Sequence, residues 1–176
     1  MIYEFCAENV TLLEKAMQAG ARRIELCDNL AVGGTTPSYG VTKAAVELAA
    51  NYDTTIMTMI RPRGGDFVYT DLEIAIMLED IRLTAQAGSQ GVVFGALTAD
   101  KKLDKANLEK LIAASKGMEI VYHMAFDELS DEDQLEAIDW LSQAGVTRIL
   151  TRAGVSGDSL EKRFAHYHRI LKHAAG

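Results

Sequence analysis

This chain has no long apolar run, no excess of basic residues and only two cysteines. No apolar stretch approaches the roughly 18 to 20 residues that a membrane-spanning helix needs. The net charge is −7, because 25 aspartates and glutamates outnumber 18 lysines and arginines. Nucleic acids and anionic membrane surfaces require a concentrated basic face. We therefore expect no nucleic-acid partner and no membrane partner, but a small molecule or another protein.

The N-terminal residues indicate the compartment, and the compartment indicates the state of the two cysteines. Residues 1–8, Met-Ile-Tyr-Glu-Phe-Cys-Ala-Glu, alternate like a strand and lack the basic and apolar segments of a secretory signal. We expect a cytoplasmic protein in which Cys6 and Cys27 stay reduced and form no structural disulfide. With 176 residues, 48% hydrophobic and 24% charged, the composition predicts one globular domain over residues 1–176.

A joint between a helix and a strand recurs along the chain. Three segments, beginning at Gln18, Gln86 and Gln143, read Gln-Ala-Gly and lead into a β-branched apolar run. Glycine suits the left-handed position after a helix, so each segment predicts a helix end followed by a strand. The expected strands cover residues 2–7, 23–28, 54–61, 91–97, 119–126 and 148–152.

Helical patterns lie between these strands, and several have recognisable starts. Thr70 with Glu73, and Asp158 with Glu161, match the capping box at a helix N-terminus. The other helices are expected to begin near Asn9, Asp104, Ser130 and Pro37, the last with Thr36 as its cap.

Alternating strands and helices predict a parallel sheet, either doubly wound or closed as a TIM (β/α)8 barrel. A closed barrel needs eight βα units, whereas this sequence shows six and ends in another glycine-terminated joint at Gly176. We therefore expect a C-terminally incomplete barrel whose last two units are missing. The two unpaired edges of such a sheet invite association, so a homo-oligomer is expected.

Several polar residues are predicted at one end of the barrel. Function in this fold collects at the carboxyl ends of the strands, where alternate side chains point inward. There Glu25, His123 and Asp127 are candidate catalytic groups, because a carboxylate and an imidazole near neutral pKa can move a proton on a small anionic or sugar-like substrate. The alternative is a structural ion-pair network inside the barrel.

The segment "IRPRGGDF" at residues 60–67 adds candidate ligand-binding residues. Two glycines give its loop the freedom to bring Arg63 and Asp66 over the barrel opening, while Arg61 is expected at the inner end of the third strand. Guanidinium groups bind carboxylates and phosphates. Thr151, at the end of the sixth strand, completes the predicted ligand-binding set.

The two cysteines suggest a different chemistry. The triplets "EFC" and "ELC" predict that Cys6 and Cys27 occupy equivalent positions in neighbouring strands, about 5 Å apart. Two thiolates at that spacing could bind Cu(I), with Met57 or Met59 as soft auxiliary ligands. The alternative is that both cysteines are small buried hydrophobes.

Two further signals are weaker. His166, His168 and His173 fall on the last predicted helix without the spacing of a helical metal site, which favours a solvated helix. The segment Gly33-Gly-Thr-Thr-Pro37 could present the amides of a helix N-terminus to an anion.

Four motifs, in order, resemble one known family. They read "RIELCDNLAVGGTTPSYG", "MIRPRGGDFVYTDLEIAIMLEDIRL", "GVVFGALTADKKLD" and "HMAFDE", and the resemblance to the CutC copper homeostasis proteins runs over residues 2–154. It implies a cytoplasmic TIM barrel, often oligomeric, that binds Cu(I) through the cysteines matching Cys6 and Cys27, and it assigns no reaction. Three hypotheses follow: a Cu(I)-binding homeostasis protein, a barrel enzyme, and an interaction scaffold without chemistry.

Overall fold

The computed structural model describes residues 1–154 and 157–175 and contains six strands alternating with six α-helices. The strands are β1 (Glu4–Glu8), β2 (Arg23–Cys27), β3 (Thr55–Met59), β4 (Gly91–Phe94), β5 (Glu119–Tyr122) and β6 (Arg148–Ile149). The helices are α1 (Leu13–Gln18), α2 (Tyr39–Ala49), α3 (Asp71–Ala87), α4 (Lys105–Ala114), α5 (Asp131–Gln143) and α6 (Leu160–Ala174). Two 3₁₀ helices, η1 (Leu30–Val32) and η2 (Met124–Glu128), follow β2 and β5. The predicted alternation of strands and helices is confirmed.

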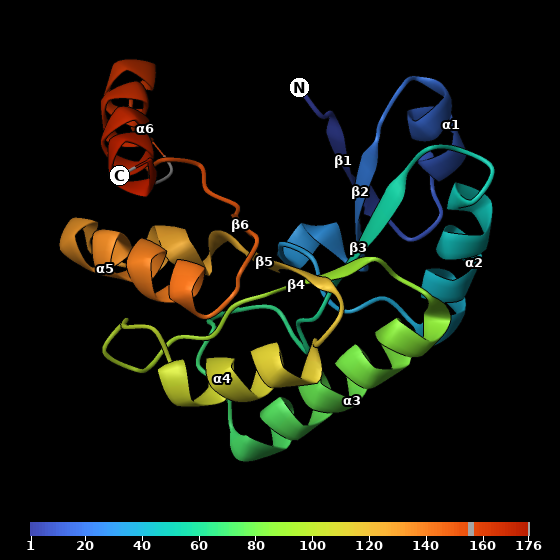
Figure 1. Ribbon diagram of the computed structural model, residues 1–176, viewed down its shortest axis with the longest axis horizontal. Coiled ribbons are helices and arrows are strands. Elements are labelled where there is room, and N and C mark those ends of the chain that lie inside the picture. Colours follow the sequence, from blue (N-terminus) through green and yellow to red (C-terminus); the bar gives the residue numbers. More distant parts are fainter. Residues whose placement is uncertain (155–156, 176) are drawn as a thin grey trace.

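The sheet is an open, curled half-barrel (Figure 1). All six strands are parallel and pair in chain order from β1 to β6. Helices α1 to α5 follow the outer face, and α6 packs against α5 beyond the β6 edge. Among the described residues, β1 pairs only with β2 and β6 only with β5. The predicted TIM-type α/β fold with six βα units is confirmed.

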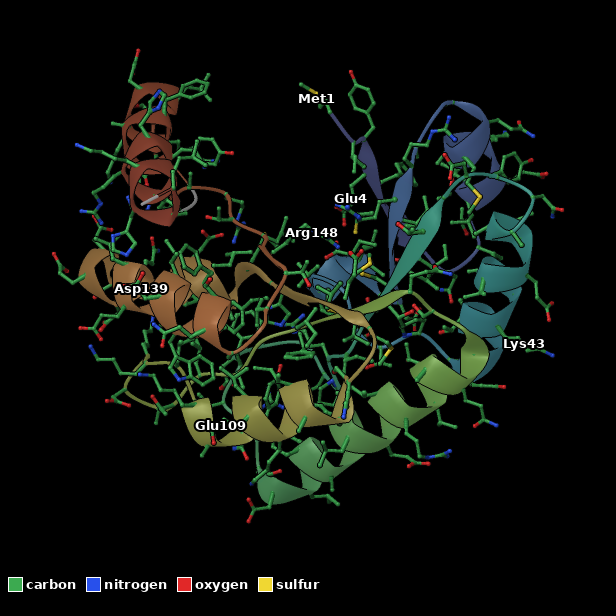
Figure 2. All side chains as sticks on the ribbon, in the orientation of Figure 1. Met1, Glu4, Lys43, Glu109, Asp139 and Arg148 are labelled. Carbon is green, nitrogen blue, oxygen red and sulfur yellow. The ribbon has the colours of Figure 1, made fainter. Side chains whose placement is uncertain are left out.

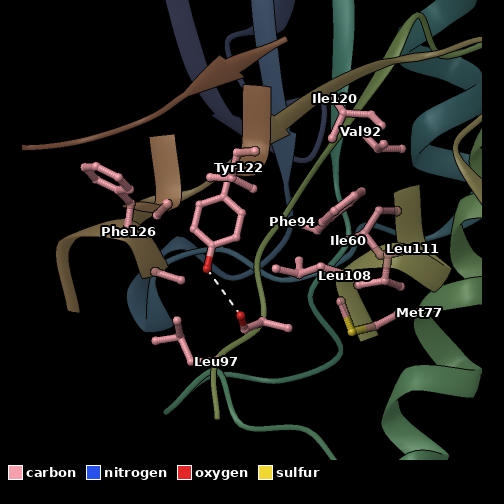
Figure 3. Packing of buried hydrophobic residues seen from close by; sticks show 14 of the residues in the cluster. Ile60, Met77, Val92, Phe94, Leu97, Leu108, Leu111, Ile120, Tyr122 and Phe126 are labelled. Atoms are coloured by element: carbon pink, nitrogen blue, oxygen red, sulfur yellow. Dashed lines mark hydrogen bonds between the residues drawn. The ribbon is translucent and has the colours of Figure 1, made fainter. Parts of the chain in front are cut away.

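Alternation along the strands divides the core into two parts. Side chains that face outward pack under the helices in a large cluster (Figure 3), which includes Val92, Phe94, Leu108 and Tyr122. The Tyr122 hydroxyl donates to the carbonyl of Ala96 at 3.3 Å, so its polar end is satisfied. Side chains that face the concave side form a smaller cluster of Cys27, Met57, Met59, Val93 and Val121. This inner cluster positions the candidate site.

The helix starts follow the predicted chemistry only in part. The capping box of Thr70 and Glu73 at α3 is confirmed, with both reciprocal hydrogen bonds present. The helix predicted to begin near Pro37 is present as α2, but the predicted cap, Thr36, was wrong, because Ser38 is the cap and accepts from the backbone N–H of Val41. The hydroxyl of Thr36 instead accepts from the backbone N–H of Arg61 at 2.9 Å, a tertiary contact that no local pattern reveals.

The start of α6 and the end of β5 also differ from prediction. Ser159, not Asp158, caps α6. The predicted strand over residues 119–126 ends at Tyr122, because Nδ1 of His123 accepts from the backbone N–H of Ala125 at 3.1 Å and the chain turns into η2. No helix in the described part of the chain is long and apolar enough to cross a membrane.

Candidate functional site

Two thiols and a carboxyl group meet on the concave face of the sheet. The ligand atoms of Cys6, Glu25 and Cys27 all lie within 4.8 Å of one another. The strand register places Cys6 opposite Glu25, and Glu8 opposite Cys27. The cysteines are therefore diagonal neighbours and not directly opposite as predicted, because barrel strands are staggered against each other. Their side chains nevertheless converge, and we call these three residues the thiol cluster.

Burial controls the protonation of the thiol cluster. Cys6 is exposed, whereas Cys27 is only 1% exposed and Glu25 is buried as well. Burial raises the pKa of Glu25, partly opposed by its hydrogen bond with Cys6. The hydrogen bond with Cys6, together with burial, raises the pKa of the Cys27 thiol well above its usual range. Without a metal ion, Cys27 is therefore a neutral thiol.

Soft and closely packed groups surround Cys27. The thioethers of Met57 and Met59 belong to the same inner cluster, and Met57 lies opposite Glu25 in the register. A Cβ atom on Gly34 would lie only 3.0 Å from the Cys27 sulfur, so the backbone of that loop closes over the thiol. The cluster is closed at Cys27 and open at Cys6.

Charged pairs line the concave face near the amino ends of the strands. Arg23 pairs with Glu4 at 3.2 Å, and Arg148 pairs with Glu119 at 2.6 Å. Figure 2 labels Glu4 and Arg148 on the two edge strands, β1 and β6. An ion-pair lining is thus present inside the half-barrel, but residues other than the predicted ones form it.

Arg61 follows β3, which ends at Met59, and its side chain clamps two loops. Its side chain is 4% exposed. One Nη atom donates to the carbonyls of Val32 at 2.8 Å and Gly34 at 2.9 Å, and the other donates to the carbonyl of Gly65 at 2.8 Å. The guanidinium therefore joins the loop after β2 to the loop after β3.

Arg63 is held by ion pairs within its own loop and with α3. Its guanidinium pairs with Asp66 at 3.0 Å and with Glu73 of α3, and it lies 5.4 Å from the ring centroid of Tyr69. The carboxylates of Asp66 and Glu73 therefore hold the Arg63 guanidinium against its own loop and the start of α3. The contact with Glu73 joins residues ten positions apart and depends on how the loop folds back.

His123 is a buried, neutral imidazole beside Arg61. Burial, together with the charge of Arg61, lowers the pKa of His123 to about 3. Because Nδ1 accepts from the backbone of Ala125, the ring proton is on Nε2, which has no hydrogen-bond partner among the described residues. The ring packs against Phe67, with 4.8 Å between centroids. At neutral pH this imidazole offers an N–H donor.

Asp127 of η2 and Thr151 of the loop after β6 contact each other. The Thr151 hydroxyl donates to one carboxylate oxygen of Asp127, and the backbone N–H of Arg152 donates to the other at 3.0 Å. Asp127 thereby joins η2 to the loop after β6. No hydrogen bond or ion pair in residues 1–154 and 157–175 joins Glu25 to Arg61, His123 or Asp127. The structure therefore groups His123 with Arg61 and Asp127 with Thr151, and leaves Glu25 with the cysteines.

Sequence reasoning missed the residues that complete these groups. Gly34 was noted only as part of a glycine loop, but it packs on Cys27. Phe67 and Tyr69 belong to no motif, but each stacks under a guanidinium, Phe67 under Arg61 and Tyr69 under Arg63. The only signal in the sequence is that two aromatic residues follow two arginines closely. The last helix is also less solvated than expected, since His166 contacts Gln134 at 2.7 Å and His173 contacts Asp139 at 2.9 Å.

The sequence is similar to that of proteins from one known family. The sequence profile of the CutC family matches residues 1–175. A family protein CutC from Enterococcus faecalis is 51% identical over 174 residues, which cover 99% of this chain and 83% of that protein. A family protein CutC from Streptococcus pyogenes is 52% identical over 151 residues, which cover 86% of this chain and 72% of that protein.

Solved structures share the fold of this chain. A CutC protein from Streptococcus agalactiae, provisionally described as a copper homeostasis protein, superposes with a TM-score of 0.95 at 43% identity and covers 100% of this chain and 84% of its own. An archaeal fructose-1,6-bisphosphate aldolase shares the fold alone, with a TM-score of 0.67 and 14% identity over 93% of this chain and 62% of its own. The match over residues 1–175 and the identity to its relatives show that this chain belongs to the CutC family.

Proposed function

We propose that this protein serves copper homeostasis and binds Cu(I) through the thiolates of Cys6 and Cys27. The observation that carries the proposal is the convergence of both sulfurs and the Glu25 carboxyl group within 4.8 Å. Cu(I) is a soft ion that prefers thiolate and thioether ligands. Membership of the CutC family, and the description of the Streptococcus agalactiae relative, support the choice of copper.

The spacing of the two sulfurs suits one bridging ion. Metal–thiolate bonds of about 2.3 Å are typical of a comparable ion such as zinc, so a single ion can join sulfurs up to about 4.6 Å apart. The sulfurs of Cys6 and Cys27 are at most 4.8 Å apart, so a small movement of the exposed Cys6 would complete the site. The thioethers of Met57 and Met59 supply soft contacts next to Cys27.

Glu25 has a supporting role in this proposal. Its carboxyl oxygen is a hard ligand, which Cu(I) does not favour. Its hydrogen bond with Cys6 instead holds that sulfur beside Cys27, and the carboxylate can pass to water the proton that leaves when the ion enters.

An anaerobic titration with Cu(I) against a competing chelator tests the proposal. The full chain should bind one Cu(I), and Cys27→Ser or Cys6→Ser should lower the affinity about tenfold or more, because one metal–thiolate bond is lost. Met17→Leu is the matched control, since Met17 is a buried thioether on the helix side of the sheet, and its affinity should equal that of wild type. Equal affinity for wild type and Cys27→Ser would refute the two-thiolate site.

A further inference from the structure

Arg61 is a buried cation without a counter-ion. Its side chain is 4% exposed, and no carboxylate lies within ion-pair distance of it in the described part of the chain. Both Nη atoms donate to neutral carbonyl oxygens, and Nε has no hydrogen-bond partner. Charges in protein interiors are usually paired, because burying an isolated charge costs much more than burying a neutral group. The charge of Arg61 therefore calls for an anion that these residues do not supply.

Two more unsatisfied donors lie beside this cation. The Nε2–H of His123 and the hydroxyl proton of Tyr69 are buried and have no acceptor among the described residues. Arg61 and His123 contact the same ring, with 5.0 Å from the guanidinium carbon to the Phe67 centroid and 4.8 Å between the rings of Phe67 and His123. Burial raises the pKa of Tyr69 to about 12, and the charge of Arg61 together with a hydrogen-bonding contact from its guanidinium to the Tyr69 oxygen opposes this shift.

Buried polar groups in native proteins are almost always hydrogen-bonded, so neighbouring exceptions need an explanation. All three unsatisfied atoms here carry a proton: the Nε–H of Arg61, the Nε2–H of His123 and the hydroxyl of Tyr69. A group that only accepts hydrogen bonds and carries negative charge would satisfy them. A metal ion would not, because Nδ1 of His123 already accepts from Ala125 and Nε2 carries the proton.

We propose that the mouth of the half-barrel beside β3 and β5 binds a small oxyanion, the carboxylate or phosphate group of a metabolite, through Arg61, His123 and Tyr69. Carboxylate and phosphate oxygens form their strongest hydrogen bonds with such charged and polar donors. The anion would supply the missing counter-charge to Arg61. This site uses none of the three residues of the thiol cluster, although Gly34 contacts both Arg61 and Cys27, and it needs no copper.

Local packing holds the imidazole in place for this role. A Cβ atom on Gly95 would lie 2.6 Å from Cε1 of His123, so only glycine leaves room for the ring in its present orientation. Because the donor atoms are closed to solvent, the loop that carries Phe67 must open to admit the anion, and binding will stabilise the closed loop.

Titration of the full chain with sodium phosphate and, separately, sodium acetate at constant ionic strength tests this site. The side-chain ¹⁵N resonances of Arg61 Nε and His123 Nε2 report binding directly, and the unfolding temperature reports it independently. We expect a saturable shift of both resonances and a higher unfolding temperature. A response to phosphate but not acetate assigns a phosphate group, and the reverse assigns a carboxylate.

Two tyrosine variants provide the matched comparison. Tyr69→Phe removes one hydroxyl donor and should weaken anion binding about tenfold. Tyr122→Phe removes a buried hydroxyl that already donates to Ala96, so its anion affinity should equal that of wild type. If neither anion gives a saturable shift in wild type up to about 10 mM, or if Tyr69→Phe binds as tightly as wild type, the oxyanion site is wrong. The absence of any shift would assign the three donors to buried water.

Discussion

The affinity of the thiol cluster for Cu(I) should depend steeply on pH. Thiolates bind the ion, so each cysteine that enters the site as a thiol releases one proton. The hydrogen bond with Cys6 and burial raise the pKa of Cys27, so this residue keeps its proton through the neutral range. Affinity should therefore increase with rising pH and should not level off there, because ionisation of Cys27 without metal lies at higher pH.

Proton stoichiometry sets the magnitude. Release of two protons raises the apparent association constant about 100-fold for each pH unit, and release of one proton raises it about tenfold. Two convergent cysteines therefore predict a slope near the larger value wherever both are protonated. Cys6→Ser removes one thiol and should reduce the slope to about tenfold for each pH unit.

Competition with a chelator of known proton affinity, repeated between about pH 6 and pH 8, measures this slope. Met17→Leu, whose sulfur lies in the outer core, should reproduce the wild-type slope. A wild-type affinity that is constant or falls with pH would refute thiolate binding. A slope that Cys6→Ser leaves unchanged would show that Cys6 contributes no thiolate, and the two-cysteine site would then be wrong.

Two further predictions concern the stability of the fold. Asp127→Ala should lower the free energy of unfolding by about 3 kcal/mol, because the Thr151 hydroxyl and a backbone N–H lose a charged acceptor. Urea denaturation measures this change. A loss of less than about 1 kcal/mol would contradict the prediction. Gly91→Ala should cost about 1–3 kcal/mol by overpacking, since its Cβ would lie 2.7 Å from the carbonyl of Glu119. Gly40→Ala in α2 is the control, because no close contact arises there, and it should leave thermal stability unchanged or higher. Equal losses of stability in both glycine variants would refute the packing argument.

The sequence predicted the fold because its signals are local. Three kinds of signal act within a few residues: a glycine after a helix, such as Gly88 after α3, an apolar run, and the capping box of Thr70 and Glu73. Together they specify alternating strands and helices. Period-two alternation also placed Cys6 and Cys27 on the same face of the sheet. These features were predictable since secondary structure is largely a matter of neighbouring residues.

The contacts of the site residues were not predictable in the same way. The curl of the whole sheet sets the stagger between β1 and β2. This stagger places Glu25 opposite Cys6 and makes the two cysteines diagonal neighbours. Loop folding turned Arg63 toward Glu73 and left Arg61 with carbonyl acceptors and no carboxylate.

Protonation likewise depended on the tertiary structure. His123 looked like a proton carrier in the sequence, because an exposed imidazole titrates near neutral pH. Burial lowers its pKa to about 3 and leaves it a neutral donor beside an unpaired cation. Residue type and alternation, both local, were thus determined by the sequence itself, whereas register, hydrogen-bond partners and charge state arose only when distant segments packed together and excluded water.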